Sequence, residues 1–391
     1  MSSINQLIGR LFKENTCYIL AYMDFNKEFT SEFILEITTH LITNNLVFKN
    51  NIENEENGVL DIERHMSIKY VDKDRFNDYI SIINDKDISN IFYLVCCIDD
   101  NNKASRIYIR VNHAYADGYK LLNMAAISIF KTDYVIPKFK RSTPNILSTL
   151  YNYTIGTLIL AIIYIQISIT LLWNISTYFN EKQVQGLTDY IICKPFKLDK
   201  IKKFASDNNI TVNDFLYSVM IKTDQLYNKT NRNINTFIPF NVSNIEYTNN
   251  ILPVLIPISN SLDNKKLLHY LHNIFDYFKY SLFIPILKVC TYTTNYMPIN
   301  LMSFFYNLAG SQQDYMYTNM ISPSFTSSKD DLQITNVNFL ISSNYNTIIF
   351  NSISVENNVN LICSFKNGII PNKKKFKKCV YKAYKKLLKT V

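Results

Sequence analysis

The chain has 391 residues, of which 47% are hydrophobic, 14% aromatic and only 19% charged. This composition is typical of a globular protein with a large core and excludes a disordered chain. The net charge of +9 has one source, because residues 373–389 hold nine lysines and no acid, and without them 32 basic residues face 32 acidic ones. A neutral body with one basic segment argues against nucleic-acid binding and leaves an anionic membrane surface, or simple solvation, as the use of that segment.

Cysteine and glycine usage excludes several kinds of site. The seven cysteines are scattered and form no C-x-x-C pair, so neither a disulfide framework nor a zinc site is indicated, and a reducing compartment is expected. The first 16 residues mix charges among their apolar residues, unlike a secretory signal peptide. Seven glycines with no G-x-G-x-x-G and no G-x-x-x-x-G-K disfavour a nucleotide-binding loop. We expect no metal and no bound cofactor.

Hydrophobic periodicity predicts mixed α/β structure in both halves of the chain. In chain order the expected elements are a strand at 16–25, a helix at 31–44, a hairpin of strands at 91–98 and 107–111, a helix after Gly118, an uncharged apolar segment at 142–180, helices at 197–207 and 211–227, strands at 237–242, 251–258 and within 332–364, and a lysine-rich helix at 373–388. The apolar segment divides the chain, which predicts an N-terminal unit at 1–141 and a C-terminal unit at 181–391.

The strand that leads to His113 carries the candidate catalytic residue. Its alternation, RIYIRVNH, places His113 on the face of Ile107, Ile109 and Val111. A neutral imidazole there is suited to remove a proton from a hydroxyl or thiol as it attacks a carbonyl. Asp117 is suited to fix the following turn, and Gly118 to let the chain enter the next helix. The alternative is a hydrogen-bonded core histidine followed by an ordinary turn.

Five segments together resemble one family. NHAYADG, at 112–118, resembles the H-H-x-x-x-D-G motif of the coenzyme A-dependent acyltransferases. Four others resemble, in the same order, segments of the wax ester synthase/diacylglycerol acyltransferase (WS/DGAT) family: DIERHM at 61–66, TVNDFLYSVM at 211–220, FIPFNV at 237–242 and YTNMISP at 317–323. The resemblance implies an α/β fold of two chloramphenicol-acetyltransferase-like lobes around a central substrate channel, with acyl-CoA and an alcohol entering from opposite ends.

The resemblance also implies roles for single residues. His113 becomes the base that deprotonates a fatty alcohol or diacylglycerol hydroxyl, and Asp117 a structural partner that points away from the substrate. Asn213 becomes a hydrogen-bond donor to the substrate or to the tetrahedral oxyanion, and Asn112 is expected to contact the same groups. The alternative for T-V-N-D is purely structural, because Thr211 and Asp214 have the spacing of an acidic capping box.

The chain departs from the family pattern at several points, and it has no convincing copy of the family's P-L-F-L-W-G segment. Asn112 replaces the first histidine of the motif, which is expected to spare the chemistry because the second histidine is the base. The family's P-G-P turn has become I-S-P, which could change how the C-terminal lobe closes on the acyl donor. His65 is expected to hydrogen-bond within its lobe. His269 and His272 lie three residues apart without an acidic or cysteine partner at ligand spacing, so no metal is expected there.

The apolar stretch at 156–175 is long enough to match a hydrocarbon slab of about 30 Å. A single span would place His113 and Asn213 on opposite sides of the membrane, so the acyltransferase interpretation leaves a re-entrant hairpin, an in-plane interfacial helix or a helix buried between the lobes. The sequence thus predicts an O-acyltransferase on the cytosolic face of a membrane, at the endoplasmic reticulum or a lipid droplet. It would use acyl-CoA and a lipid alcohol to make triacylglycerol or wax ester. The alternatives are a degenerate relative that only binds acyl-CoA or lipid, and a structural membrane protein.

Overall fold

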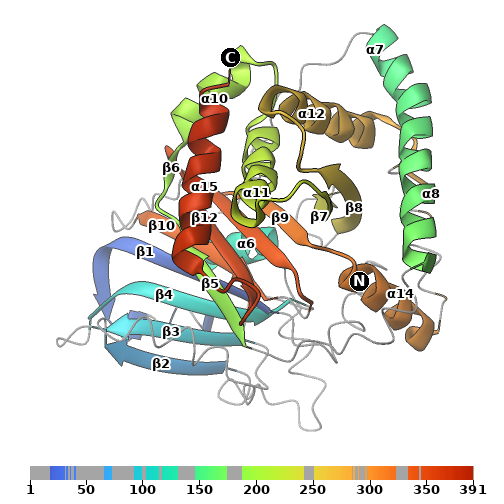
Figure 1. The fold of residues 1–391 in the computed structure, drawn as a ribbon. Helices are drawn as coiled ribbons and strands as arrows, with labels where there is room; N and C mark the ends of the chain where they lie inside the picture. The colour runs from blue at the N-terminus through green and yellow to red at the C-terminus, as the bar shows by residue number, and fades with distance from the viewer. Residues whose placement is uncertain are drawn as a thin grey trace.

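The structure is a computed structural model of the 391-residue chain. It describes residues 18–30, 66–72, 92–98, 103–113, 117–130, 146–173, 187–241, 251–283, 298–322, 333–342 and 345–390, with residues 32, 33, 36, 39, 40, 285, 286, 289 and 296. Two β-sheets, with helices packed on them, form two lobes (Figure 1). The mixed α/β architecture is therefore confirmed.

The N-terminal sheet has five strands and carries the strand that leads to His113. In spatial order they are β10 (Ile334–Ile341), β1 (Tyr18–Thr30), β4 (Lys103–Asn112), β3 (Phe92–Ile98) and β2 (Met66–Asp72). On β4 the side chains of Ile107, Ile109 and Val111 are buried, as their alternation predicts. On its other face Arg106 pairs with Asp24 of β1. The expected β3–β4 hairpin is confirmed by their antiparallel pairing.

Strand β10 joins the two lobes, because it comes from the C-terminal half of the chain but pairs antiparallel with β1. Its other neighbours belong to the C-terminal sheet: Ser364 Oγ donates to the carbonyl oxygen of Ile341 over 2.8 Å, and Asn360 Nδ2 donates to that of Val337 over 2.7 Å. The unit predicted at 181–391 thus contributes a strand to the sheet of the unit predicted at 1–141.

The C-terminal sheet is mixed, with parallel pairing of β9 to both β7 and β11. Its strands, in spatial order, are β5 (Thr188–Ile192), β12 (Asn358–Lys366), β11 (Ile348–Val355), β9 (Tyr315–Ile321), β7 (Asn233–Asn241) and β8 (Ile251–Ser259), with β6 (Phe196–Lys197) pairing β12 beside β5. The strands expected at 237–242, 251–258 and within 332–364 are confirmed.

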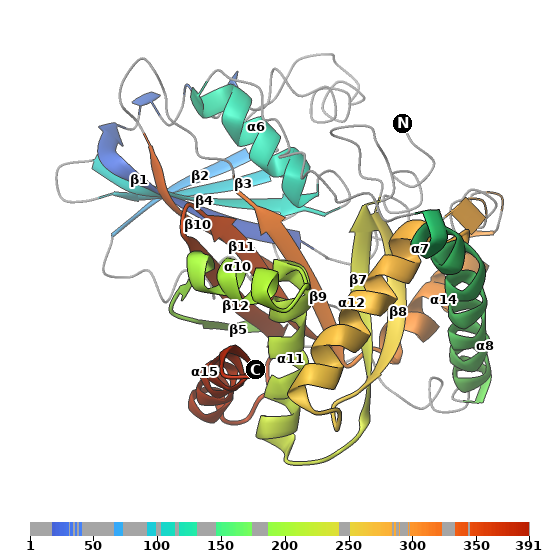
Figure 2. The same cartoon turned by 90° about the horizontal axis from the view of Figure 1, so that it is seen from above.

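Helices cover one face of the C-terminal sheet (Figure 2). The helices outside the N-terminal lobe are α7 (Ile146–Tyr151), α8 (Thr157–Trp173), α10 (Leu198–Asp207), α11 (Val212–Asn228), α12 (Asn264–Tyr280), α14 (Ile299–Ser311) and α15 (Lys373–Leu388). Helix α11 contacts α15 on one side and α12 on the other, and α12 in turn contacts α8. The lysine-rich helix and the apolar helix therefore lie at opposite ends of this layer.

The layer is held to the sheet by aromatic side chains. The fully buried ring of Tyr217 on α11 packs edge-on against Tyr317 of β9 and Phe275 of α12, with ring centroids 5.3 and 5.4 Å apart. On α15, the buried residues Phe376, Cys379, Val380, Ala383 and Leu387 recur at helical spacing, while the lysines face outward. This periodicity confirms the helix expected at 373–388.

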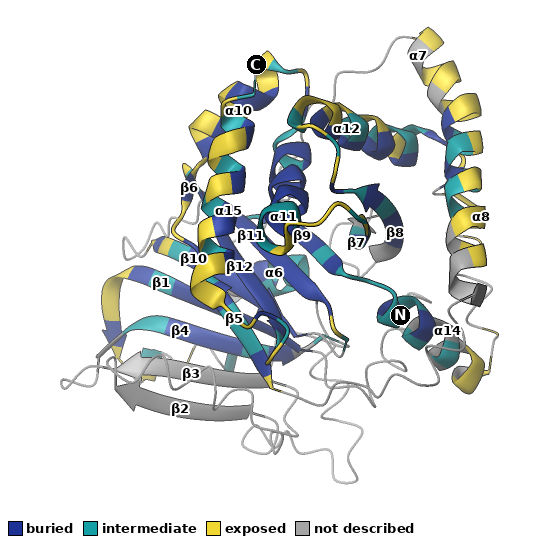
Figure 3. Cartoon of the chain, viewed as in Figure 1, coloured by how far each residue is buried: buried dark blue, intermediate teal, exposed yellow. Residues whose placement is uncertain are grey.

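The apolar segment is helical and lies on the outside of the C-terminal lobe. A π-helical turn (Asn152–Gly156) joins α7 to α8. Gly156 lies against Tyr277 of α12, Leu160 is fully buried, and the ring of Tyr164 lies 4.4 Å from that of Phe283. The opposite side of α8 is exposed along its described length (Figure 3). Among the described residues, α8 packs one face against α12 and β8 and exposes the other, which differs from a helix buried between the lobes.

Candidate active site

His113 lies directly after the last residue of β4, where the chain leaves the N-terminal sheet. Burial lowers the pKa of its imidazole, while its own backbone and the nearby Asp117 oppose that effect. The ring is therefore neutral at pH 7, which is the form that a general base requires.

Asp117 begins the helix that follows. Its Oδ1 accepts a hydrogen bond from the backbone N–H of Lys120 over 2.7 Å, and its carbonyl oxygen accepts one from Leu121 N–H over 3.0 Å. These bonds make Asp117 the N-cap of α6 (Gly118–Phe130). Burial raises the pKa of its carboxyl group, against the lowering effect of the Lys120 N–H and of His113. A buried carboxylate that caps α6 fixes the start of this helix, four residues after His113.

Asp117→Ala is expected to destabilise the protein by about 1 kcal/mol, the usual cost of losing an N-cap, and to lower activity as a consequence. Asp117→Asn is the matched control, because asparagine also caps helices. Thermal melting together with turnover per folded molecule tests this role. A normally melting but inactive Asp117→Ala protein would instead assign the carboxylate to the chemistry.

Gly118 brings this loop onto the C-terminal lobe. A Cβ atom at Gly118 would overlap the sulfur of Met320 on β9 and would lie 2.9 Å from its Cε. Met320 is buried. Because glycine has no side chain, the start of α6 packs directly against Met320 of β9. This close approach requires a glycine at position 118.

Asn213 belongs to the first turn of α11 and faces the same strand. Its Oδ1 accepts a hydrogen bond from Asn319 Nδ2 over 3.4 Å, and Asn319 Oδ1 accepts one from Ser352 Oγ over 2.9 Å. Asn319 directly precedes Met320, the neighbour of Gly118. Strand β9 therefore contacts both motifs, NHAYADG through Met320 and TVND through Asn319.

Asp214 is fully buried and forms the capping box that its spacing predicts. Thr211 Oγ1 accepts from Asp214 N–H over 3.1 Å, and Asp214 Oδ2 accepts from Thr211 N–H over 2.8 Å. The same Oδ2 lies 2.8 Å from Nδ1 of His272 on α12. The sequence interpretation considered His272 only as a metal ligand, and this ion-pair partner could not be read from it because Asp214 lies on another helix.

Three residues near the site were not assigned by the sequence interpretation: Asn319, Met320 and His272. The first two lie within the YTNMISP segment, whose resemblance was noted, but the pattern does not say which of its side chains faces which lobe. Residues 114–116, His65 and the side chain of Asn112 lie outside the described part of the structure. Among the residues that the structure does describe, no group of three or more His, Cys, Asp or Glu could hold a metal.

Chemically, the arrangement offers a neutral base on one lobe and amide side chains on the other. A neutral imidazole can accept a hydroxyl proton, and amide N–H groups can stabilise an oxyanion. These are the elements that acyl transfer to a hydroxyl requires.

Solved structures share this fold over nearly the whole chain. The wax ester synthase/diacylglycerol acyltransferase from Marinobacter aquaeolei VT8 matches with a TM-score of 0.58 and 12% identity over 98% of this chain and 97% of that one. The trichothecene 15-O-acetyltransferase from Fusarium sporotrichioides matches with a TM-score of 0.62 and 11% identity, covering 97% and 94%. The starter condensation domain of rhizomide synthetase, in complex with C8-CoA and Leu-SNAC, matches with a TM-score of 0.55 and 8% identity, covering 99% and 93%.

These likenesses define the class: the chain has the two-lobed fold of coenzyme A-dependent acyltransferases and condensation domains. The family model of the WS/DGAT C-terminal domain matches residues 247–388. Residues 247–388 are thus similar to the WS/DGAT C-terminal domain, and the whole chain has the fold of a solved WS/DGAT protein, in agreement with the resemblance seen in the sequence. No curated protein matches it in sequence.

Proposed function

We propose that this protein transfers a fatty acyl group from acyl-CoA to a lipid alcohol, either diacylglycerol or a long-chain alcohol, and so makes triacylglycerol or wax ester. One observation carries the proposal: a half-buried, neutral His113 directly follows β4, four residues before Asp117 caps α6 and Gly118 packs against Met320 of β9. The WS/DGAT C-terminal domain supports the choice of a lipid alcohol as acceptor.

In the proposed reaction His113 takes the proton of the alcohol hydroxyl while the oxygen attacks the thioester carbonyl carbon. The tetrahedral intermediate then collapses, the carbon–sulfur bond breaks, and the imidazolium returns the proton to the leaving thiolate of CoA. Because Asn213 Oδ1 accepts from Asn319, the Nδ2 of Asn213 is the atom that serves as donor to the oxyanion. No cofactor takes part, and acyl-CoA is a co-substrate. The rhizomide starter condensation domain, which shares the fold, has been solved with C8-CoA, and this supports a CoA thioester as donor.

We further propose that α8 lies in the plane of a membrane on its cytosolic face, where water-insoluble acceptors reside. The helical window Thr149–Gln166 is long and apolar enough to cross a membrane, and only 12% of it is buried inside the protein. Its exposed leucine and isoleucine side chains therefore present an apolar surface to the solvent. Such a surface fits a lipid interface, at the endoplasmic reticulum or a lipid droplet. Because β10 joins both lobes into one fold, a single span at 156–175 is disfavoured.

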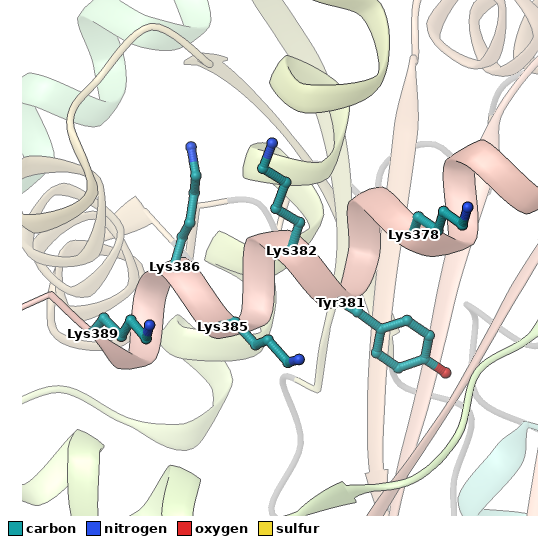
Figure 4. A pocket seen from close by; sticks show the side chains of 6 residues that line it. All are labelled: Lys378, Tyr381, Lys382, Lys385, Lys386 and Lys389. Carbon is teal, nitrogen blue, oxygen red and sulfur yellow. The ribbon is translucent and has the colours of Figure 1, made fainter.

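The basic helix α15, at the other end of the helix layer, offers a second surface that suits an anionic membrane. A pocket of about 320 Å³ on it is lined by Tyr381 and five lysines, Lys378, Lys382, Lys385, Lys386 and Lys389 (Figure 4). Lys382 and Lys386 point to the same side of the helix, one turn apart. Clustered ammonium groups of this kind attract anionic lipid headgroups, at about 1 kcal/mol per lysine near the surface.

The test is product formation. Protein bound to liposomes is incubated with a radiolabelled long-chain acyl-CoA and, in separate reactions, with diacylglycerol and with alcohols of increasing chain length. We expect labelled triacylglycerol or wax ester together with stoichiometric free CoA. Saturable acyl-CoA binding without either product would favour the degenerate relative that only binds ligand. Neither binding nor turnover would favour a structural membrane protein.

A further inference from the structure

Asp214, which follows Asn213 in the first turn of α11, forms an ion pair with His272 of α12. Asp214 is fully buried, and one of its oxygens, Oδ2, both caps the first turn of α11 and contacts Nδ1 of His272. In the part of the chain that the structure describes, the other oxygen, Oδ1, accepts no hydrogen bond. A buried carboxylate with so few partners depends strongly on each of them.

His272 faces charged groups on several elements. On its own helix, Asp276 Oδ2 lies 3.5 Å from Nε2, and Lys279 Nζ lies 3.2 Å from Asp276 Oδ1. Beyond Asp214, the buried phenol of Tyr317 on β9 is near enough for the carboxylate to raise its pKa, in addition to the larger effect of burial. The hydrogen bond to Asp214 raises the pKa of His272, against desolvation and Lys279. In the protonated form of His272, each of the two ring nitrogens therefore lies next to a carboxylate, that of Asp214 or that of Asp276.

The geometry of this pair bears on the active site. Asp214 is the residue after Asn213, and the N-terminal turn of α11 determines where Asn213 meets Asn319 on β9. A misplaced catalytic group costs rate steeply, on the order of 10²-fold for about 1 Å. Any partner that holds Asp214 in place therefore also holds Asn213.

We propose that His272 is a positioning residue which, in its protonated form, clamps Asp214 and so fixes Asn213 at the acyl-transfer site. This rests on the proposed function only for its effect on rate, because the clamp itself is a property of the fold. The pair connects α12 to the N-terminal turn of α11, the turn that carries Asn213. His272 therefore acts through Asn213 and does not contact the substrate.

The sign of the pH effect follows from the raised pKa of His272. Its ion pair contributes stability in full below the ordinary imidazole pKa of about 6.5 and loses it as the pH rises through the higher pKa of the folded protein. Activity that depends on the clamp falls over the same alkaline range.

The test compares His272→Gln, which keeps a hydrogen-bond donor but no charge, with His269→Gln, a matched change at an exposed histidine one turn earlier on the same helix. Thermal melting is measured from pH 5.5 to 9.5, and kcat and KM are measured over the same range. We expect wild type and His269→Gln to lose stability and kcat together on the alkaline side. His272→Gln is expected to be less stable at pH 6 and to show no alkaline loss of stability or of kcat. Its kcat is expected to be lower, on the order of tenfold, with the KM for acyl-CoA unchanged.

The two proposals fail in different ways. If His272→Gln melts like wild type at every pH, the clamp is wrong, whether or not the protein transfers acyl groups. If its melting changes while kcat at pH 6 does not, His272 only stabilises the fold and the positioning role is wrong. If wild type shows no turnover, the proposed function fails, and the melting curves alone still decide whether the clamp exists. An NMR titration that gives His272 a pKa no higher than the ordinary imidazole value of about 6.5 would also contradict the clamp.

Discussion

Replacing His113 with alanine is expected to lower ester formation by about 10²–10⁴-fold and to leave the protein folded. The loss in rate follows because the imidazole is the group that takes the hydroxyl proton. The fold is expected to survive because His113 lies beyond the last residue of β4, while the strand's buried residues Ile107, Ile109 and Val111 remain. Product formation per folded molecule is the measurement, with thermal melting to confirm folding.

His269→Ala is the control, because this histidine is exposed on α12. Comparable turnover in His113→Ala and wild type would contradict the role of His113 as the general base. The pH dependence gives a second check: burial lowers the pKa of His113, so the neutral base persists to a lower pH than a free imidazole would allow. The acid limb of kcat/KM is therefore expected below pH 6.5, in the opposite direction to the alkaline limb assigned to His272.

The parts of the site that were predictable from sequence are those built from neighbouring residues. Alternation along β4 places His113 at a strand end, and the spacing of Thr211 and Asp214 predicts the capping box that α11 has. These patterns are readable because strand pleating and helix capping act over two to four residues. Residues 32, 33, 36, 39 and 40 are helical, in line with the helix expected at 31–44.

The parts that were missed depend on contacts between distant segments. Nothing local in the sequence of β10 indicates that it pairs with β1, more than 300 residues earlier. The partner of His272 lies 58 residues away on another helix. One signal was available, since His272 directly follows Leu271 in the buried stripe of α12 and therefore lies at the edge of a packed face. A histidine at such an edge meets whatever polar group the neighbouring helix presents.

The face on which α8 packs against the protein also determines how the apolar segment can meet a membrane. Its composition alone is compatible with a span, an interfacial helix or a buried one, because α8 is apolar on all sides. The structure divides it into two faces: one packs on α12 and β8, and the other is exposed. Leu158, Ile162, Ile165 and Ile169 are 58, 49, 59 and 59% exposed and recur at intervals of three and four residues, so they lie on the outer face. That face can be altered without disturbing the packed one.

Changing these four residues to serine is therefore expected to release the protein from liposomes while its melting temperature stays the same. Each large apolar side chain contributes about 1.5–3 kcal/mol when it leaves water, so the four together far exceed the affinity of a weak peripheral contact. The matched comparison changes Lys378, Lys382, Lys385 and Lys389 on α15 to glutamine. These lysines contribute about 1 kcal/mol each at an anionic surface and are screened by salt, so their loss should weaken binding only partly and make it less salt-sensitive. Flotation with neutral and anionic liposomes, at low and high salt, separates the two surfaces. If high salt alone releases the wild-type protein, α15 is the anchor and the outer face of α8 does not lie in lipid.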